Sequence, residues 1–247
     1  MIDYIKLTLS DFLYYRTINN NLMDELSVNG FIELPSLSKD FCSSIISEID
    51  FLEHYDNLKT QSFQSSGDTR HWIPKNYINT PNIIKLSSQN HKLIPKRLRY
   101  YYAKDRLSMV NVLNQEMKKG STGSGEGWHC DSPFSHQIKI FTFLKDVNTD
   151  NGPLRLIPKS HQKNNKYSIH KKLKKNMSSM RYDDNEIKVI EDMGFKVKEL
   201  LVPKGSRFLV DTRIIHAGKA IKKDKRYAIT DYYFKSNKEL NNLFNRI

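Results

Sequence analysis

Cysteine is scarce in this chain of 247 residues, which has only Cys42 and Cys130. Two cysteines are too few for the disulfide framework of a small secreted domain, so we expect a reducing, cytoplasmic setting. The sequence also has no run that approaches the ~18 consecutive apolar residues of a membrane-spanning helix. Its first residues lack the apolar stretch and small-residue cleavage site of a signal peptide, so we expect no such leader.

Acidic residues are also in short supply, with 27 Asp and Glu against 40 Lys and Arg, for a formal net charge of +13. A basic surface can indicate nucleic acid, an anionic membrane or an acidic substrate. Here the lysines are spread along the chain, and few aromatic residues interleave with them as they do on a nucleic-acid platform. We therefore interpret the charge mainly as lysine-rich composition. We expect a small-molecule substrate, with an anionic one left open, rather than nucleic acid.

Short strand-like segments dominate the chain after about residue 106. β-branched and aromatic residues, alternating in places with polar ones, predict these strands. They lie at residues 107–117, 138–147, 154–158, 197–203, 206–212 and 227–234. Many short strands with turns between them predict a sandwich or a barrel. A hydrophobic fraction of 38% is typical of a soluble chain with its own core.

The residues before this region predict mostly helical and irregular support, at about 1–105 of a single domain that spans 1–247. Within it, residues 29–35 predict a short strand, and an amphipathic pattern predicts a helix with Ser38 as its N-cap. The polar stretch from Gln61 to Asp68 predicts a loop. In the core at about 106–235, the lysine-rich segment 163–195 shows little strand character, so we expect a lid-like insertion over the rim.

A metal-binding pattern appears in the tripeptide His129-Cys130-Asp131. Alternate residues of an extended segment point to the same side, so His129 and Asp131 are placed to chelate one metal. His216 lies at the end of another predicted strand and supplies a third ligand. Two histidines and one carboxylate on one face leave the opposite positions open, as in non-haem Fe(II) oxygenases. A short H-x-D also arises by chance, and a surface histidine beside an aspartate is then the alternative.

Arg226 follows His216 by ten residues, at the start of the next predicted strand. If the two strands are neighbours, the guanidinium points into the same cavity as the metal ligands. Arginine offers a planar, bidentate fork to a carboxylate. This arrangement suits a dicarboxylate cosubstrate that chelates the metal at one end and is anchored at the other. The alternative is a surface arginine among several lysines.

Several longer stretches carry a resemblance to a known family. They are GWHCDSPF at 127–134, FLKDVNTDNGPLRLIPKSH at 143–161, KGSRFLVDTRIIHAG at 204–218 and NGFIELPSLSKDFCSSIISEID at 29–50. In these the sequence resembles the phytanoyl-CoA dioxygenase family of Fe(II)- and 2-oxoglutarate-dependent oxygenases. The NGPLRLIPKSH segment is the most specific match. It has no role in metal binding, so it supports the resemblance independently of the H-x-D motif.

The resemblance implies a mainly β fold with flanking helices around a double-stranded β-helix (jelly-roll, cupin-like) core. It implies Fe(II), 2-oxoglutarate and O2 as the reacting cofactors. The catalytic iron ligands that it implies are His129, Asp131 and His216. For 2-oxoglutarate, it implies that Arg226 binds the distal carboxylate, that Phe141 lines the pocket and that Asn114 makes a polar contact.

The presence of Asp131 bears on the type of reaction, since related halogenases carry a small residue at this position. The resemblance therefore implies hydroxylation, or a related oxidation such as desaturation, with release of succinate and CO2. Two alternatives stay open. One is an oxygenase that acts on nucleic acid or protein, which the net charge motivates, and the other is a non-catalytic jelly-roll binding module.

Other polar residues lie near these motifs. We interpret His136 and His170 as surface residues, and His161 as the end of a structural turn. Asp211 and Arg213 flank the segment that leads to His216, so they are candidates for orienting a metal ligand or for contacting the substrate.

Overall fold

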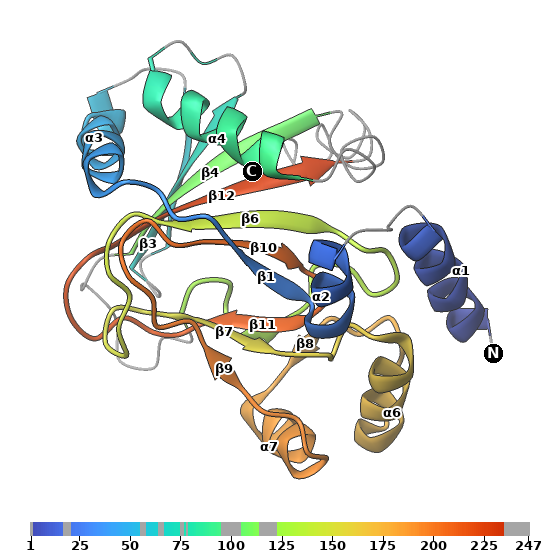
Figure 1. The fold of residues 1–247 in the computed structure, drawn as a ribbon. Helices are drawn as coiled ribbons and strands as arrows, with labels where there is room; N and C mark the ends of the chain where they lie inside the picture. Colours follow the sequence, from blue (N-terminus) through green and yellow to red (C-terminus); the bar gives the residue numbers. More distant parts are fainter. Residues whose placement is uncertain are drawn as a thin grey trace.

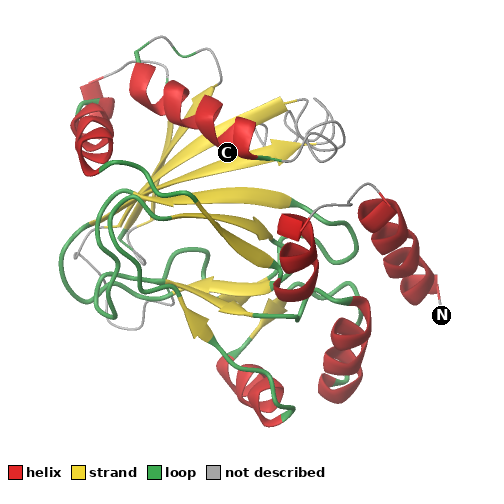
Figure 2. Ribbon diagram, in the orientation of Figure 1, coloured by secondary structure: helices red, strands yellow, loops and turns green. Residues whose placement is uncertain are grey.

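The computed structural model describes residues 2–16, 21–54, 58–63, 67–74, 77, 79–94, 105–113 and 123–234. These residues form two antiparallel sheets that lie one above the other, with helices on the outside (Figure 1 and Figure 2). The mainly β architecture with flanking helices is thus confirmed. None of the helices described is long and apolar enough to cross a bilayer.

The larger sheet has seven strands and contains the longest pairings of the fold. Its order is β1 (Phe31–Leu34), β10 (Arg207–Asp211), β6 (Ile138–Phe143), β12 (Arg226–Phe234), β4 (Asp105–Leu113), β3 (Asp68–Pro74) and β2 (Lys59–Phe63). β12 pairs with β4 along its whole length, from Arg226 opposite Leu113 to Phe234 opposite Asp105. Alternate side chains of β6 and β12 line a cavity that residues of the smaller sheet also line.

The smaller sheet has five strands of two to four residues. Its order is β8 (Arg181–Tyr182), β5 (Trp128–His129), β11 (Ile215–Gly218), β7 (Leu154–Ile157) and β9 (Lys198–Glu199). β11 is its central strand, and its His216 lies directly opposite His129 of β5. Two of the predicted metal ligands are therefore cross-strand neighbours.

Two groups of helices flank the sheets. α3 (Lys39–Asp50) and α4 (Pro81–Leu93) cover the outer face of the larger sheet (Figure 1). Ser38 caps α3 by accepting a hydrogen bond from the Phe41 amide, as its sequence predicts. α6 (Lys163–Leu173) and α7 (Asp184–Asp192) lie beside the smaller sheet, and α2 (Asn21–Asn29) packs on β1. The N-terminal helix α1 (Ile2–Arg16) packs on α6.

Apolar packing fixes these layers. Between the sheets lie Phe143, Leu156, Phe208 and Val210, each almost fully buried. Full burial of a side chain of this size contributes about 2 kcal/mol. A second cluster joins α3 and α4 to the outer face of the larger sheet, so the strands that carry the cavity are held from both sides.

Two regions differ from the sequence prediction. The predicted loop at residues 61–68 is wrong in part, because Gln61 to Phe63 belong to β2 and Asp68 begins β3. β2 is an edge strand with polar, largely exposed side chains, so its sequence has no apolar pattern. Segment 163–195 is helical in part, as predicted, but it also contributes β8 to the edge of the smaller sheet.

Candidate metal and cosubstrate site

A cavity of about 270 Å³ lies between the two sheets. Side chains from β5, β11 and β7 of the smaller sheet line one wall, and those from β3, β4, β6 and β12 of the larger sheet line the other. Polar lining residues are Arg70, Asn111, Ser124, His129, Asp131, Lys139, Arg181, His216, Arg226, Thr230 and Tyr232. The remaining lining residues are Met109, Gly125, Phe141, Phe143, Leu154, Gly218 and Ala228.

His129, Asp131 and His216 converge at one end of this cavity. One ligand atom from each lies within 4.8 Å of the other two. The Nε2 atom of His129 is 3.9 Å from Oδ1 of Asp131, and that of His216 is 3.8 Å from Oδ2 of Asp131. The predicted cluster is thus assembled from the end of β5 and from β11, and its donor set suits a facial metal site.

Backbone carbonyls orient both imidazole rings. Nδ1–H of His129 donates to the Gly127 carbonyl, and Nδ1–H of His216 donates to the Ile214 carbonyl, each at 2.9 Å. Because a carbonyl can only accept, each Nδ1 carries the proton and each Nε2 presents its lone pair to the third ligand. This is the tautomer that a metal requires at Nε2.

The protonation states of the ligands also suit a metal. Burial lowers the pKa of His129 to about 3, helped by the nearby His216, and burial also lowers the pKa of His216. Burial raises the pKa of the Asp131 carboxyl, but Lys139 and the two histidines outweigh it and hold that pKa well below its ordinary value. At neutral pH the site therefore contains two neutral imidazoles and one carboxylate.

Lys139 is a buried cation beside the metal end. Its Nζ lies 2.8 Å from Oδ2 of Asp131 and 4.0 Å from the centre of the Tyr232 ring. Asp131 is the one carboxylate with which the described structure pairs it. Lys139 is not among the residues that the sequence predicts for the site, although period-two alternation in β6 places it on the same face as Phe141.

Arg226 begins β12 and lies buried in the same cavity, as its spacing predicts. Its Nη1 donates to the Gly152 carbonyl and its Nη2 donates to Oδ1 of Asn111 at 3.1 Å. Its buried Nε has no hydrogen-bond partner among the described residues, and no described carboxylate forms an ion pair with the guanidinium. Burial lowers the pKa of Arg226 to about 10, so it still carries its charge at neutral pH. A carboxylate in the cavity would satisfy both the open donor and the charge.

The other predicted cosubstrate contacts have different outcomes. Phe141 lines the cavity from β6, between Thr230 of β12 and Phe208 of β10. Asn114 lies outside the described residues. Asn111, three positions earlier on β4, lines the cavity and holds Arg226, and alternation with Met109 in the same strand is the sequence signal that marks it.

Two histidines predicted on the surface are buried instead, so those interpretations are wrong. His136 is 1% exposed and lies between the carboxylates of Asp211 and Asp11. His170 is also 1% exposed and bonds to the Tyr182 hydroxyl at 2.8 Å. The polar partners of His136 are remote in sequence, whereas those of His170 are Asn176 and Tyr182, which follow it just beyond the end of α6.

The model of the phytanoyl-CoA dioxygenase (PhyH) family matches residues 59–228, which is well over half of the chain. The chain belongs to the phytanoyl-CoA dioxygenase family. The matched range includes the three clustered ligands and Arg226. No curated protein sequence matches the chain.

Solved structures with a similar fold include EctD from S. alaskensis, with a TM-score of 0.61 at 15% identity over 88% of this chain and 77% of that one. Another is the epimerase SnoN in complex with Fe3+, alpha ketoglutarate and nogalamycin RO, with a TM-score of 0.59 at 13% identity over 87% of this chain and 82% of that one. A third is a prolyl hydroxylase from Trichoplax adhaerens in complex with a hypoxia inducible factor peptide fragment, with a TM-score of 0.54 at 19% identity over 93% of this chain and 90% of that one. These similarities confirm the predicted jelly-roll fold.

Proposed function

We propose that the protein is an Fe(II)- and 2-oxoglutarate-dependent dioxygenase that hydroxylates a small-molecule metabolite. The observation that carries this proposal is the combination of two features in one cavity. His129, Asp131 and His216 form a three-ligand cluster at one end, and Arg226 presents a buried, unsatisfied Nε elsewhere on the wall. A three-residue metal site alone would fit many activities, whereas a metal site with an arginine that can bind a carboxylate fits a keto-acid cosubstrate.

In this proposal His129, Asp131 and His216 hold Fe(II), and Arg226 holds the distal carboxylate of 2-oxoglutarate with Phe141 beside its chain. The bound iron and keto acid supply the oxidation of the substrate by O2, with succinate and CO2 as products. The protein's own part is to orient these groups and to exclude water. Asn111 and Gly152 fix the guanidinium, and apolar side chains of the two sheets enclose the cavity.

The substrate would enter at the metal end, where the wall is cationic. Lys139 and Arg181 line this end, and no described carboxylate other than Asp131 pairs with either one. Arg181 donates from Nη1 to the backbone carbonyls of Gly125 and Glu126. Once the metal takes Asp131, these cations favour a small substrate with a negative group. The limited cavity volume also favours a small molecule.

The direct test is anaerobic addition of Fe(II) and 2-oxoglutarate, which should give the weak visible charge-transfer band of this class. Asp131→Ala should abolish the band, because it removes a metal ligand. Arg226→Ala should weaken it at limiting 2-oxoglutarate, because the anchor is lost. Asp192→Ala, an exposed residue on α7, is the control and should behave as the wild type. Failure of the wild type to bind 2-oxoglutarate at all would contradict the proposal. A band without succinate formation in a substrate screen would favour the non-catalytic module.

A macromolecular substrate is the second candidate, motivated by the net charge of +13. It predicts binding to nucleic acid or peptide that survives moderate salt. A steep loss of nucleic-acid binding with salt would indicate nonspecific contact with phosphates. In either case we propose one catalytic domain, with segment 163–195 at the edge of the cavity, in a reducing cytoplasmic setting. Cys42 and Cys130 are both free and buried, which supports that setting.

A further inference from the structure

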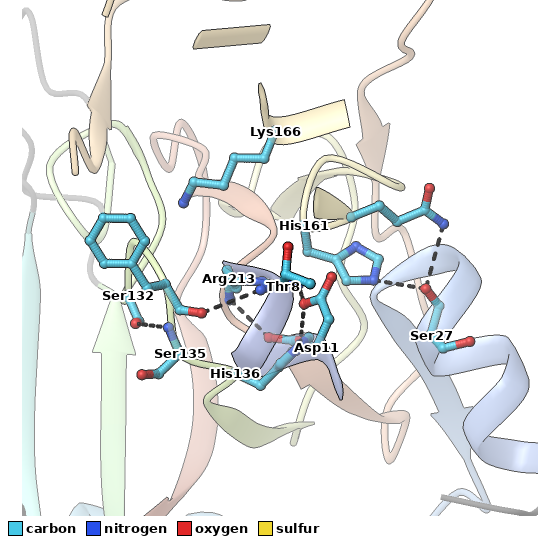
Figure 3. Close-up of polar contacts among 12 residues, drawn as sticks. Thr8, Asp11, Ser27, Ser132, Ser135, His136, His161, Lys166 and Arg213 are labelled. Atoms are coloured by element: carbon cyan, nitrogen blue, oxygen red, sulfur yellow. Dashed lines mark hydrogen bonds and ion pairs between the residues drawn. The ribbon is translucent and has the colours of Figure 1, made fainter. Parts of the chain in front are cut away.

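The N-terminal helix α1 lies outside residues 59–228, the part that matches the family model, yet it places a carboxylate in the core. Figure 3 shows Asp11 of α1 beside Arg213 and His136. Oδ1 of Asp11 is 2.7 Å from Nη2 of Arg213 and 3.0 Å from Nε2 of His136. An element outside the family-matched core therefore takes part in a buried polar cluster.

The cluster is almost completely shielded from water. The side chains of Arg213 and His136 are 0% exposed, that of Asp211 is 1% and that of Asp11 is 15%. His136 bridges the two carboxylates, with Nδ1 bonded to Asp211 and Nε2 to Asp11. Burial raises the pKa of the Asp11 carboxyl, but the hydrogen bond with His136 and the charge of Arg213 together lower it below its ordinary value. Asp11 is therefore ionised in the folded protein at neutral pH.

Arg213 forms a direct ion pair with Asp11, whereas Asp211, whose pKa Arg213 also helps to lower, is paired first with His136. The one ion pair of Arg213 among the described residues is with Asp11, and its Nη1 donates to the Phe134 carbonyl at 3.3 Å. Neither its Nε nor its Nη2 has a hydrogen-bond partner among the described residues, so the contact of Nη2 with Asp11 is an ion pair. A buried guanidinium that loses its carboxylate leaves an uncompensated charge, which a folded protein tolerates poorly. The amides of Arg213 and Thr212 are also bonded, to Oδ1 of Asp211 at 3.1 Å and to the Gln137 carbonyl at 2.7 Å. Without Asp11, the backbone around Arg213 is therefore expected to shift slightly while the turn stays formed.

That backbone is the turn at residues 212–214, which supports two metal ligands. The Asp131 amide donates to the Thr212 carbonyl at 2.9 Å, and Nδ1–H of His216 donates to the Ile214 carbonyl at 2.9 Å. Arg213 lies between these two carbonyls in the chain. A shift of its backbone would move the carboxylate of one ligand and the ring of the other.

We propose that Asp11 is a positioning residue of the metal centre, through its ion pair with Arg213 and the turn at residues 212–214. Docking of α1 thereby sets the affinity of the site for its metal. The inference rests on the proposed metal site. It assigns to α1 a role that the family-matched segment does not contain.

The test compares Asp11→Asn with Asp3→Asn, which removes the same charge from the same helix at an exposed pair with Lys6. The amide of asparagine nearly matches the carboxylate in size, and Leu7 and the Tyr4–Tyr167 contact remain to dock α1. The measurements are the affinity for Co(II), in the presence of 2-oxoglutarate, and the visible spectrum of the bound Co(II). Circular dichroism and thermal unfolding show separately whether each variant is folded.

Asp11→Asn should weaken Co(II) binding by about tenfold or more, as loss of a group that orients a ligand does, and should change the Co(II) spectrum. Asp3→Asn should change neither. The doubly neutral variant, Asp11→Asn with Arg213→Met, also lacks the anchor of the turn and should bind Co(II) as weakly as Asp11→Asn. This second variant covers the case in which Asp11→Asn alone does not fold, because it leaves no uncompensated charge.

Wild-type affinity and spectrum in folded Asp11→Asn, or in the folded double variant, would overturn the inference. So would a loss of thermal stability with unchanged Co(II) binding below the unfolding temperature, which would mark a purely structural role. If the wild type itself fails to bind Co(II), the proposed metal site fails instead, so the two failures are distinguishable.

Discussion

The two ends of the cavity are built in different ways. At the metal end, the ligands lie on or beside strands of two to four residues, and buried charged side chains hold the neighbouring turns. At the other end, Arg226 starts a nine-residue strand that is paired on both sides, with β4 and β6. A long ladder therefore fixes the strand that Arg226 begins, whereas at the metal end short ladders are supplemented by side-chain packing and ion pairs.

This difference predicts where the site is sensitive. A long antiparallel strand pair keeps its position after a small substitution, because many backbone hydrogen bonds hold it in register. A ligand on a two-residue strand has few such hydrogen bonds, so a substitution in the residues that pack against it moves the ligand atom relative to the metal. Substitutions of similar size should therefore reduce metal affinity more at the metal end than at the Arg226 end.

The largest expected effect comes from Gly125→Ala. Gly125 has a φ of +87°, and a Cβ there would lie 2.7 Å from Cε1 of His129, so the imidazole must move. We expect metal affinity to fall by about a hundredfold, near the upper end for lost ligand orientation. Isothermal titration with Co(II) measures it.

Gly194→Ala is the matched control, because Gly194 has a φ of +94° and its Cβ would meet nothing within 4 Å. It shares the backbone strain but not the collision. Gly152→Ala tests the other end, since its Cβ would lie 3.0 Å from the Lys219 carbonyl oxygen and 3.1 Å from Leu113, and would only touch Nη1 of Arg226 at 3.7 Å. Equal losses of metal affinity at Gly125 and Gly152 would break the distinction between the two ends.

The sequence predicts the far end and the ligands better than it predicts what holds the ligands. His129, Asp131 and His216 stand out because a metal demands particular residue types at particular spacings, and all three cluster. Arg226 stands out because it follows His216 by ten residues and begins the next predicted strand. These features are local or periodic, and local patterns are what a sequence displays.

The support behind the ligands escaped prediction because it is made of pairs distant in the chain. His136 meets Asp211 and Asp11, which are 75 and 125 positions away, and nothing near His136 indicates its burial. The edge strand β2 escaped for another reason, since its exposed polar side chains give no alternating apolar pattern. Lys139 was predictable by alternation, but a lysine in a strand ordinarily points to solvent.

An intermediate effect is expected from Lys139→Met, and it should appear as a pH dependence. Burial raises the pKa of the Asp131 carboxyl and Lys139 is the strongest influence that lowers it, so removing Lys139 raises that pKa. Metal must then displace a proton from Asp131 at a pH where the wild-type carboxyl is ionised. Between pH 5 and pH 3, affinity for Co(II) should fall about sevenfold more than in the wild type, as a return of the Asp131 pKa to its ordinary value of 3.8 would give.

Lys145→Met is the control for Lys139→Met, because Lys145 also lies over a tyrosine ring, that of Tyr227 at 5.0 Å, but outside the cavity. It should leave the pH dependence unchanged. Parallel curves for the wild type and Lys139→Met would show that Asp131 does not depend on Lys139.

The smallest expected effect concerns stability, through His161 behind the metal end. This ring is 0% exposed, and its Nε2–H donates to the Ser27 carbonyl at 3.0 Å (Figure 3). Burial lowers its pKa to about 4, below the ordinary 6.5 that it regains on unfolding. Between these values the unfolded chain binds the proton and the folded protein does not, so stability falls as the pH drops below 6.5. From pH 7 to pH 5.5 this histidine should account for about 1 kcal/mol of lost stability.

His161→Gln tests this, because glutamine can still donate to Ser27 but does not titrate. Urea unfolding at pH 7 and pH 5.5 should show a loss of stability that is about 1 kcal/mol smaller than in the wild type. His54→Gln, at an exposed histidine, should keep the wild-type loss. If His161→Gln loses as much stability as the wild type, His161 does not contribute to acid sensitivity. A smaller loss of stability in His161→Gln would show that a buried side chain behind the metal end contributes to the acid sensitivity of the fold.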